Sequence, residues 1–156
     1  MTLARQKKFI DRSLKFWTLF IGIGAVWGAL MMWISPSGKM WGMEPILQFL
    51  QVLPFNEILF RNFIFSGFVL LCVNGVTQFF AAWLLFRKDR HACLAALLCG
   101  IILIMWITLE WVLWGFAWLS NIYFIFGVCE TAIAGWGVFL GKGAAPQTNS
   151  SGAAEK

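Results

Sequence analysis

The chain has 156 residues, of which 60% are hydrophobic and only 12% are charged. A soluble domain carries about twice that share of charged residues. The composition therefore excludes an ordinary soluble globular domain and indicates a protein that lies largely in lipid. We expect one compact membrane domain with no separate soluble domain beside it.

Apolar stretches long enough to cross a bilayer occur three times. The first two carry no charge, and the third, which only Glu110 and Glu130 interrupt, is long enough to cross twice. A bilayer core of about 30 Å requires about 20 residues in a helix. Helices also satisfy their own backbone polar groups where water is absent. We predict an all-α integral membrane four-helix bundle, with spans near 16–34, 62–86, 92–118 and 122–140. Ser120 and Asn121 are the expected turn between the last two spans.

The net charge of +5 is unevenly distributed along the chain. Ten of the twelve basic residues lie before the first span, between the second and third, or after the fourth, and the other two are Lys39 and Arg61. Basic residues accumulate on the cytoplasmic side of membrane proteins. We therefore expect both termini and the turn at 87–91 to be cytoplasmic. Nucleic-acid binding is not expected, because no folded basic surface remains to carry it.

The sequence divides into an arm, a membrane domain and a tail. Residues 1–15 are expected to form a basic cytoplasmic arm, in a short helix along the inner surface. Residues 16–141 form the membrane domain, and 142–156 form a disordered cytoplasmic tail. The first span exceeds the apolar part of a signal peptide, and no cleavage motif follows it. We expect it to be retained and to target the protein.

The external segment 39–61 is the longest connection between predicted spans and differs most from the rest of the sequence. Pro45 suits the first position of a helix, so residues 46–53 are expected to form a short helix that ends at Pro54. Such a helix is too short to span, and we predict that it is interfacial or re-entrant. It either caps the bundle or acts as a lid over a central cavity. The candidate site residues of this loop are Glu44, Glu57 and Arg61.

Small residues at steps of three and four allow membrane helices to approach each other closely. The first span contains such a step, and the fourth span carries Glu130 and Ala134 on one face with several glycines. We expect these faces to pack against other helices. The candidate packing residues are Gly24, Gly28, Gly127, Gly137 and Gly141.

Polar side chains at membrane depth are costly and by default mark a functional hypothesis. The candidates are Asn74, Gln78, Glu110 and Glu130. Helix rise puts Asn74 and Glu130 at similar depths, and we predict a hydrogen bond between them. No basic residue lies at that depth, so Glu130 is expected to be a neutral acid. Its role stays open between a structural acid–amide unit, a proton or cation site, and contact with a partner subunit.

The remaining reactive residues indicate little catalytic chemistry. Glu110 is expected to form an interfacial ion pair with Arg61 or Lys39, and it is too far along the chain from Glu130 to suggest a dyad. His91, the only histidine, is expected to be a solvated turn residue. The four cysteines match no zinc or haem spacing, and no nucleotide or hydrolase motif occurs. We predict no catalytic residue, no metal and no cofactor.

The run GVTQFFAAWLLFRKDR over 75–90 is followed by LLCGIILIMWITLE over 97–110. With the basic N-terminus and the sizeable first external loop, this pattern resembles small bacterial four-helix membrane proteins of the DoxX-like kind. The resemblance covers the last three spans and consists mostly of hydrophobic patterning. It implies a bacterial inner membrane and, as in some members, a quinone- or redox-associated component. It transfers no functional residue.

Three functions are compatible with these features. The first is a non-enzymatic bundle that self-associates or serves as a subunit of a membrane assembly. The second is an oligomeric proton- or cation-linked transporter or channel that uses Glu130 and Asn74. The third is a lipid- or quinone-associated enzyme that uses Glu44, Glu57 or Glu110. It ranks last, because a carboxylate without a metal, base or nucleophile is an incomplete site. The expected partners are the lipid bilayer and further copies or other membrane subunits.

Overall fold

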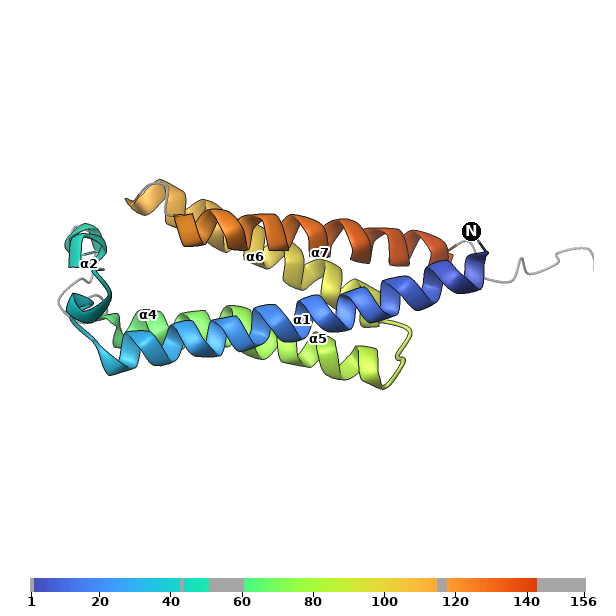
Figure 1. Ribbon diagram of the computed structural model, residues 1–156, viewed down its shortest axis with the longest axis horizontal. Helices are drawn as coiled ribbons and strands as arrows, with labels where there is room; N and C mark the ends of the chain where they lie inside the picture. The colour runs from blue at the N-terminus through green and yellow to red at the C-terminus, as the bar shows by residue number, and fades with distance from the viewer. Residues whose placement is uncertain (1, 43, 51–60, 115–117, 143–156) are drawn as a thin grey trace, which may run out of the picture.

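A computed structural model of the chain describes residues 2–42, 44–50, 61–114 and 118–142. All regular structure in these residues is helical. Four helices are long and apolar enough to cross a membrane (Figure 1). They are Leu3–Ile34, Phe63–Phe86, Ala92–Val112 and Trp118–Gly141. The all-α class and the four candidate spans are thus confirmed.

The first helix, α1, runs without a break from Leu3 to Ile34. Its 32 residues make it about 48 Å long at 1.5 Å per residue, which exceeds a bilayer core of about 30 Å. The predicted separate surface helix over 1–15 is therefore wrong, because the basic arm continues the axis of the first span. An ion pair one turn apart, between Lys15 Nζ and Asp11 Oδ2 at 2.7 Å, supports the helix where the two parts join.

The second candidate span consists of three consecutive helical segments. These are α4 (Phe63–Leu70), the π-helix η2 (Leu71–Val76) and α5 (Thr77–Phe86). Asn62 caps the start, because its Oδ1 accepts the Ile64 amide N–H at 3.1 Å. A π-helix is wider than an α-helix, and such turns occur frequently at functional sites. No pattern in the sequence predicts this π-helix.

Side chains bond two backbone carbonyls near the junction of η2 and α5, one in η2 and one at the start of α5. Thr77 Oγ1 donates to the Val73 carbonyl at 2.6 Å. The thiol of Cys99, on the neighbouring α6, donates to the Thr77 carbonyl at 3.3 Å. The change from π- to α-helix therefore keeps these backbone acceptors bonded.

The third and fourth candidate spans are α6 (Ala92–Trp114) and α7 (Trp118–Lys142). Ser120 and Asn121 lie in the first turn of α7, so the turn predicted there is wrong. Serine and asparagine are favoured in turns and also near helix starts, because their side chains bond nearby polar groups. Here the Ser120 hydroxyl bonds a side chain of α6. The predicted tail lies outside the described residues from position 143 onward.

Two short helices follow α1: the 3₁₀-helix η1 (Lys39–Trp41) and α2 (Glu44–Leu50). The helix α2 has seven residues and starts at Glu44, one position before Pro45, which was predicted as the first helical residue. It lies close to α6. The predicted end at Pro54, and Glu57, fall outside the described residues.

The four long helices form a square in which each packs on two neighbours. The helix α1 lies between the second span and α7, and α6 lies between α5 and α7. At one end, called here the loop end, α4 packs on α1 but has no extensive contact with α6 or α7 within the described residues. The α1–α4 pair and the α6–α7 pair separate toward that end (Figure 1).

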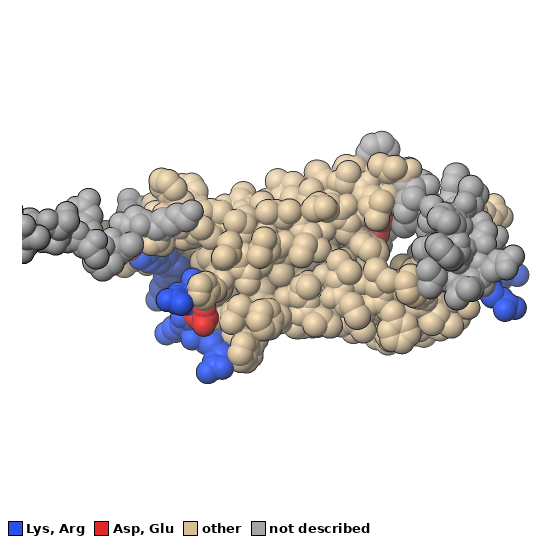
Figure 2. Space-filling model, turned by 180° about the vertical axis from the view of Figure 1, so that it is seen from behind, with Lys and Arg blue, Asp and Glu red and all other residues tan. Residues whose placement is uncertain are grey.

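Basic side chains gather at the opposite end, called here the basic end. Figure 2 shows Lys and Arg side chains clustered there, and both the start of α1 and the α5–α6 turn lie at this end. Two cations lie over aromatic rings: Lys15 Nζ is 5.2 Å from the centroid of Phe86, and Arg87 Cζ is 4.9 Å from that of Trp83. Aromatic and basic residues together are typical of a membrane–water boundary.

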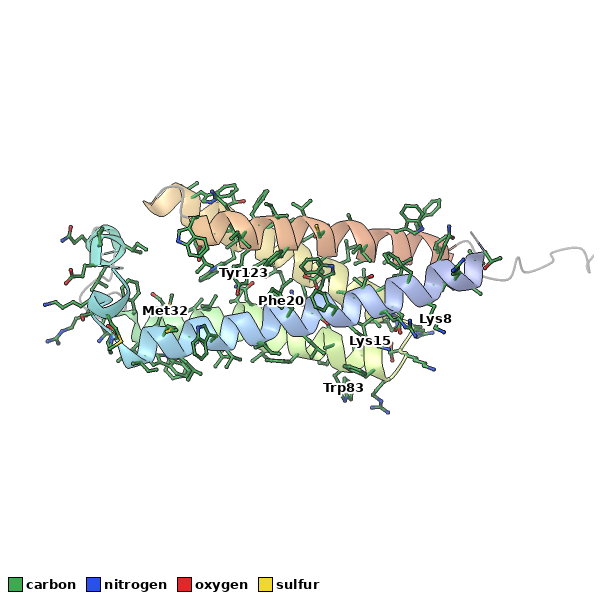
Figure 3. The ribbon with its side chains drawn as sticks, viewed as in Figure 1. Lys8, Lys15, Phe20, Met32, Trp83 and Tyr123 are labelled. Carbon is green, nitrogen blue, oxygen red and sulfur yellow. The ribbon has the colours of Figure 1, made fainter. Side chains whose placement is uncertain are left out.

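Glycines create the closest approaches between helices. The Gly24 backbone meets the Tyr123 hydroxyl of α7, which points toward α1 (Figure 3). A Cβ at Gly28 would lie 3.0 Å from Leu70 Cδ2, and one at Gly137 would lie 2.8 Å from Cys93 Sγ. Gly127 packs on Ile104 in the same way, whereas a Cβ at Gly141 would meet nothing within 4 Å. The predicted packing glycines, except Gly141, thus face other helices of the same chain.

We predict that Gly100→Ala destabilises the α6–α7 pair. The new Cβ would lie 2.5 Å from Thr131 Oγ1 and 3.0 Å from the Thr131 backbone nitrogen. Overpacking of this kind costs about 1–3 kcal/mol, so the unfolding midpoint of purified protein should fall. The matched control is Gly135→Ala, whose Cβ would have its nearest neighbour at 3.9 Å and should be tolerated. Equal midpoints for the two variants would contradict this packing.

Candidate functional site

Three polar side chains are buried within the bundle, two of them joined by a hydrogen bond and the third four residues away along the second span. Asn74 of η2, Gln78 of α5 and Glu130 of α7 expose only 2%, 1% and 0% of their surface. We call these three residues the polar centre. The sequence predicted all three as intramembrane polar residues that face other helices.

A hydrogen bond joins the second span to α7 within the polar centre. Gln78 Nε2 donates to Glu130 Oε2 at 2.8 Å. The predicted partner, Asn74, is therefore wrong. That prediction assumed a regular α-helix through position 74, but Asn74 lies in the wider π-helix and Gln78 follows where the α-helix resumes. Glutamine is also one methylene longer than asparagine.

All four long helices contribute to the surroundings of the polar centre. Gly22 of α1 packs against Gln78, where a Cβ would lie 3.4 Å from the Gln78 Cβ. Gly75 packs in turn near Ala25 of α1. Cys99 of α6 bonds the Thr77 carbonyl beside Gln78. These close contacts surround the polar side chains with protein rather than lipid.

The polar centre retains unused hydrogen-bonding capacity. Glu130 Oε1, Gln78 Oε1 and Asn74 Nδ2 are buried and have no partner among the described residues. An unsatisfied buried polar group costs about 1–3 kcal/mol, and native proteins leave few of them. These three atoms are the hydrogen-bonding groups of the polar centre that the described residues leave unused.

Glu110 belongs to a separate network near the loop end. Trp106 Nε1 donates to Glu110 Oε1 at 2.7 Å, and Ser120 Oγ donates to Glu110 Oε2 at 2.6 Å. The carboxylate thus ties the last turns of α6 to the first turn of α7. The predicted ion pair with Arg61 or Lys39 is not formed within the described residues: Lys39 Nζ lies 3.9 Å from Glu44 Oε1, and Arg61 is exposed.

Sequence reasoning missed the two donors to Glu110. Trp106 lies within a long apolar stretch, and Ser120 stands beside Asn121 in a pair that is typical of a turn. The spacing of four between Trp106 and Glu110 puts them on one helix face, and this signal could have revealed the first bond. Nothing local in the sequence indicates the second, because it depends on where α7 begins.

The other predicted site residues are scattered. Glu44 lies at the start of α2 and Glu57 falls outside the described residues. The cysteines Cys72, Cys93, Cys99 and Cys129 are free. Within the described ranges, no group of three or more His, Cys, Asp or Glu side chains could hold a metal ion.

No family model, curated protein or solved structure matches this chain. The resemblance to DoxX-like membrane proteins therefore stays a prediction.

We predict different costs for removing the two amides of the polar centre. Gln78→Leu leaves Glu130 Oε2 without its donor, and such bonds between membrane helices contribute about 1–2 kcal/mol. Asn74→Leu breaks no hydrogen bond within the described structure and should cost less. Unfolding of both variants in the same detergent, followed by circular dichroism, makes the comparison. A larger loss for Asn74→Leu would reverse the assignment of the bond.

Proposed function

We propose that this chain is a non-enzymatic, multi-pass inner-membrane protein that works as a subunit of a membrane assembly. Its four long helices cross the bilayer, and both termini and the turn at 87–91 face the cytoplasm. The clustering of Lys and Arg at the basic end supports this orientation. The partner subunits are further copies of the chain or other membrane proteins.

The separation of the two helix pairs at the loop end is the observation that carries this proposal. The helix α4 packs on α1, and the neighbouring parts of α6 are left without an extensive contact to it within the described residues. Leu109 and Val112 of α6 near this end are 51% and 78% exposed. A transmembrane helix of a partner can pack on them, because helix association in lipid depends on close van der Waals contact. The internal glycines are engaged within the chain. We therefore assign the partner contact to the loop end and not to the glycine faces.

Site-specific photo-crosslinking in native membranes tests this proposal. A photoreactive residue at Leu109, which is 51% exposed on α6 near the loop end, should capture a partner helix. The same residue at Phe139, which is 76% exposed on α7 near the basic end, should capture lipid only and serves as the control. Exclusively monomeric bands at both positions, together with a monomeric mass in nanodiscs, would rule out the assembly.

A second candidate function is ion-linked transport through the polar centre. The unpaired atoms of Glu130, Gln78 and Asn74 favour it, because intramembrane acids that face a bundle interior frequently mark ion pathways. Four helices alone enclose no wide pore, so this function also requires an assembly. The carboxyl of Glu130 would bind and release the ion.

Flux into proteoliposomes tests this second function. We expect Glu130→Gln to abolish proton or cation flux, because the variant keeps a polar side chain of similar shape but loses the ionisable group. Glu110→Gln is the matched control, since Glu110 bonds Trp106 and Ser120 in a different network and should leave flux intact. If native protein and the Glu130→Gln variant give the same flux, or neither gives any, the transport function is excluded.

A further inference from the structure

We propose that the polar centre binds one dehydrated monovalent cation of the size of Na⁺, coordinated by side-chain oxygens of Glu130, Gln78 and Asn74. This inference rests on the ion-linked function proposed above and names the ion. The site joins the middle of the second span to α7.

The charge of the site determines the charge of its ligand. The candidate spans contain no Lys or Arg between 16 and 34, 62 and 86, or 91 and 141. A Glu130 carboxylate in this region therefore has no basic side chain to neutralise it. An unpaired buried charge is strongly unfavourable, and one monovalent cation cancels it completely. A divalent ion would leave a net positive charge in a medium of low dielectric constant.

The unpaired atoms supply the coordinating groups. Glu130 Oε1 and Gln78 Oε1 are both buried without a partner, and each belongs to a side chain that the bond of 2.8 Å already positions. Asn74 lies four residues before Gln78 and is equally buried. Its unpaired Nδ2 repels a cation, but a half-turn of the amide brings Oδ1 to the same position. Three oxygens from η2, α5 and α7 can then share one ion.

The tight packing excludes a larger or hydrated ligand. The three side chains expose 2% of their surface or less, and Gly22 lies directly against Gln78. Calcium takes six to eight oxygen ligands, and magnesium keeps several of its waters. The single carboxylate balances the charge of neither dication, and the enclosed site excludes the waters that magnesium keeps. A small monovalent ion that has lost its water is the cation that matches the charge and the burial of the site.

A proton is the competing ligand. Protonation of Glu130 Oε1 would also neutralise the carboxylate and would supply a donor for Gln78 Oε1. It would leave the Asn74 amide without a partner, whereas a cation engages all three side chains. The two alternatives differ in their response to Na⁺, which provides the test.

The experiment measures the thermal unfolding midpoint of full-length protein in detergent at constant ionic strength, with NaCl replacing choline chloride. A ligand that binds only the folded state raises the midpoint in a concentration-dependent manner. We expect a saturable rise with Na⁺ for the native protein and for Glu110→Gln. The rise should be absent in Glu130→Gln and reduced in Asn74→Leu. Equal midpoints in NaCl and choline chloride for the native protein would overturn the proposal.

A second measurement keeps the test valid if Glu130→Gln fails to fold. A hydrophobic carbodiimide adds to a protonated carboxylic acid in the membrane, and the acylurea that forms is detected on Glu130 by mass spectrometry of native protein. We expect Na⁺, but not choline, to slow this labelling, because a bound cation and a proton compete for the same oxygen. Labelling of Glu130 that is independent of Na⁺ would mean that the site holds a proton only, and the cation proposal would be wrong.

The two proposals at this site fail separately. Binding of Na⁺ without any flux in proteoliposomes would leave the cation site standing and exclude transport. Flux that depends on Glu130 but is insensitive to Na⁺ in both measurements would leave a proton-linked transporter and exclude the cation site.

Discussion

The hydrogen bond between Gln78 and Glu130 is the constraint around which this bundle is arranged. It joins the second span to α7, and so connects the first pair of long helices to the second pair. Lipid offers no alternative partner to a buried amide or acid. The bond therefore fixes both the depth and the rotation of two helices relative to each other. Its two residues are almost completely buried.

The packing near this bond depends on small residues and on one irregular turn. Gly22 lets α1 pack closely against Gln78. Gly100 and Gly127 likewise let α6 and α7 approach each other closely. The π-helix η2 ends at Val76, two residues before Gln78. The Thr77 hydroxyl bonds the Val73 carbonyl of η2, and the Cys99 thiol bonds the Thr77 carbonyl at the start of α5. The helices are closely packed around the Gln78–Glu130 bond. At the loop end, in contrast, the two helix pairs separate. Within the described residues, the chain thus combines a closely packed polar centre with helix pairs that separate at the loop end.

The helical class and the four candidate spans could be predicted from the sequence, because length and hydrophobicity alone determine which segments can cross a bilayer. The burial of Asn74, Gln78 and Glu130 was also predictable, since polar groups in lipid turn toward other helices. Which of Asn74 and Gln78 bonds Glu130 could not be predicted. It depends on the π-helix, which no local pattern indicates.

Boundaries between helices were the other source of error. Ser120 and Asn121 look like a turn in the sequence, yet they begin α7, and Ser120 then reaches Glu110. The arm over 1–15 looks separate because its charge changes, but no helix breaker stands between it and the first span. Changes of composition mark where a helix enters lipid. They do not mark where it ends.

Solid-state NMR of the protein in lipid bilayers tests the central bond most directly. With ¹⁵N in the side-chain amides and ¹³C in the Glu130 carboxyl, the dipolar coupling reports which amide lies beside the acid. The structure predicts a strong coupling to Gln78 that disappears in Gln78→Leu and persists in Asn74→Leu, because Nε2 of Gln78 lies 2.8 Å from Glu130 Oε2. A coupling that disappears in Asn74→Leu instead, or no coupling to either amide, would contradict this account of the bundle.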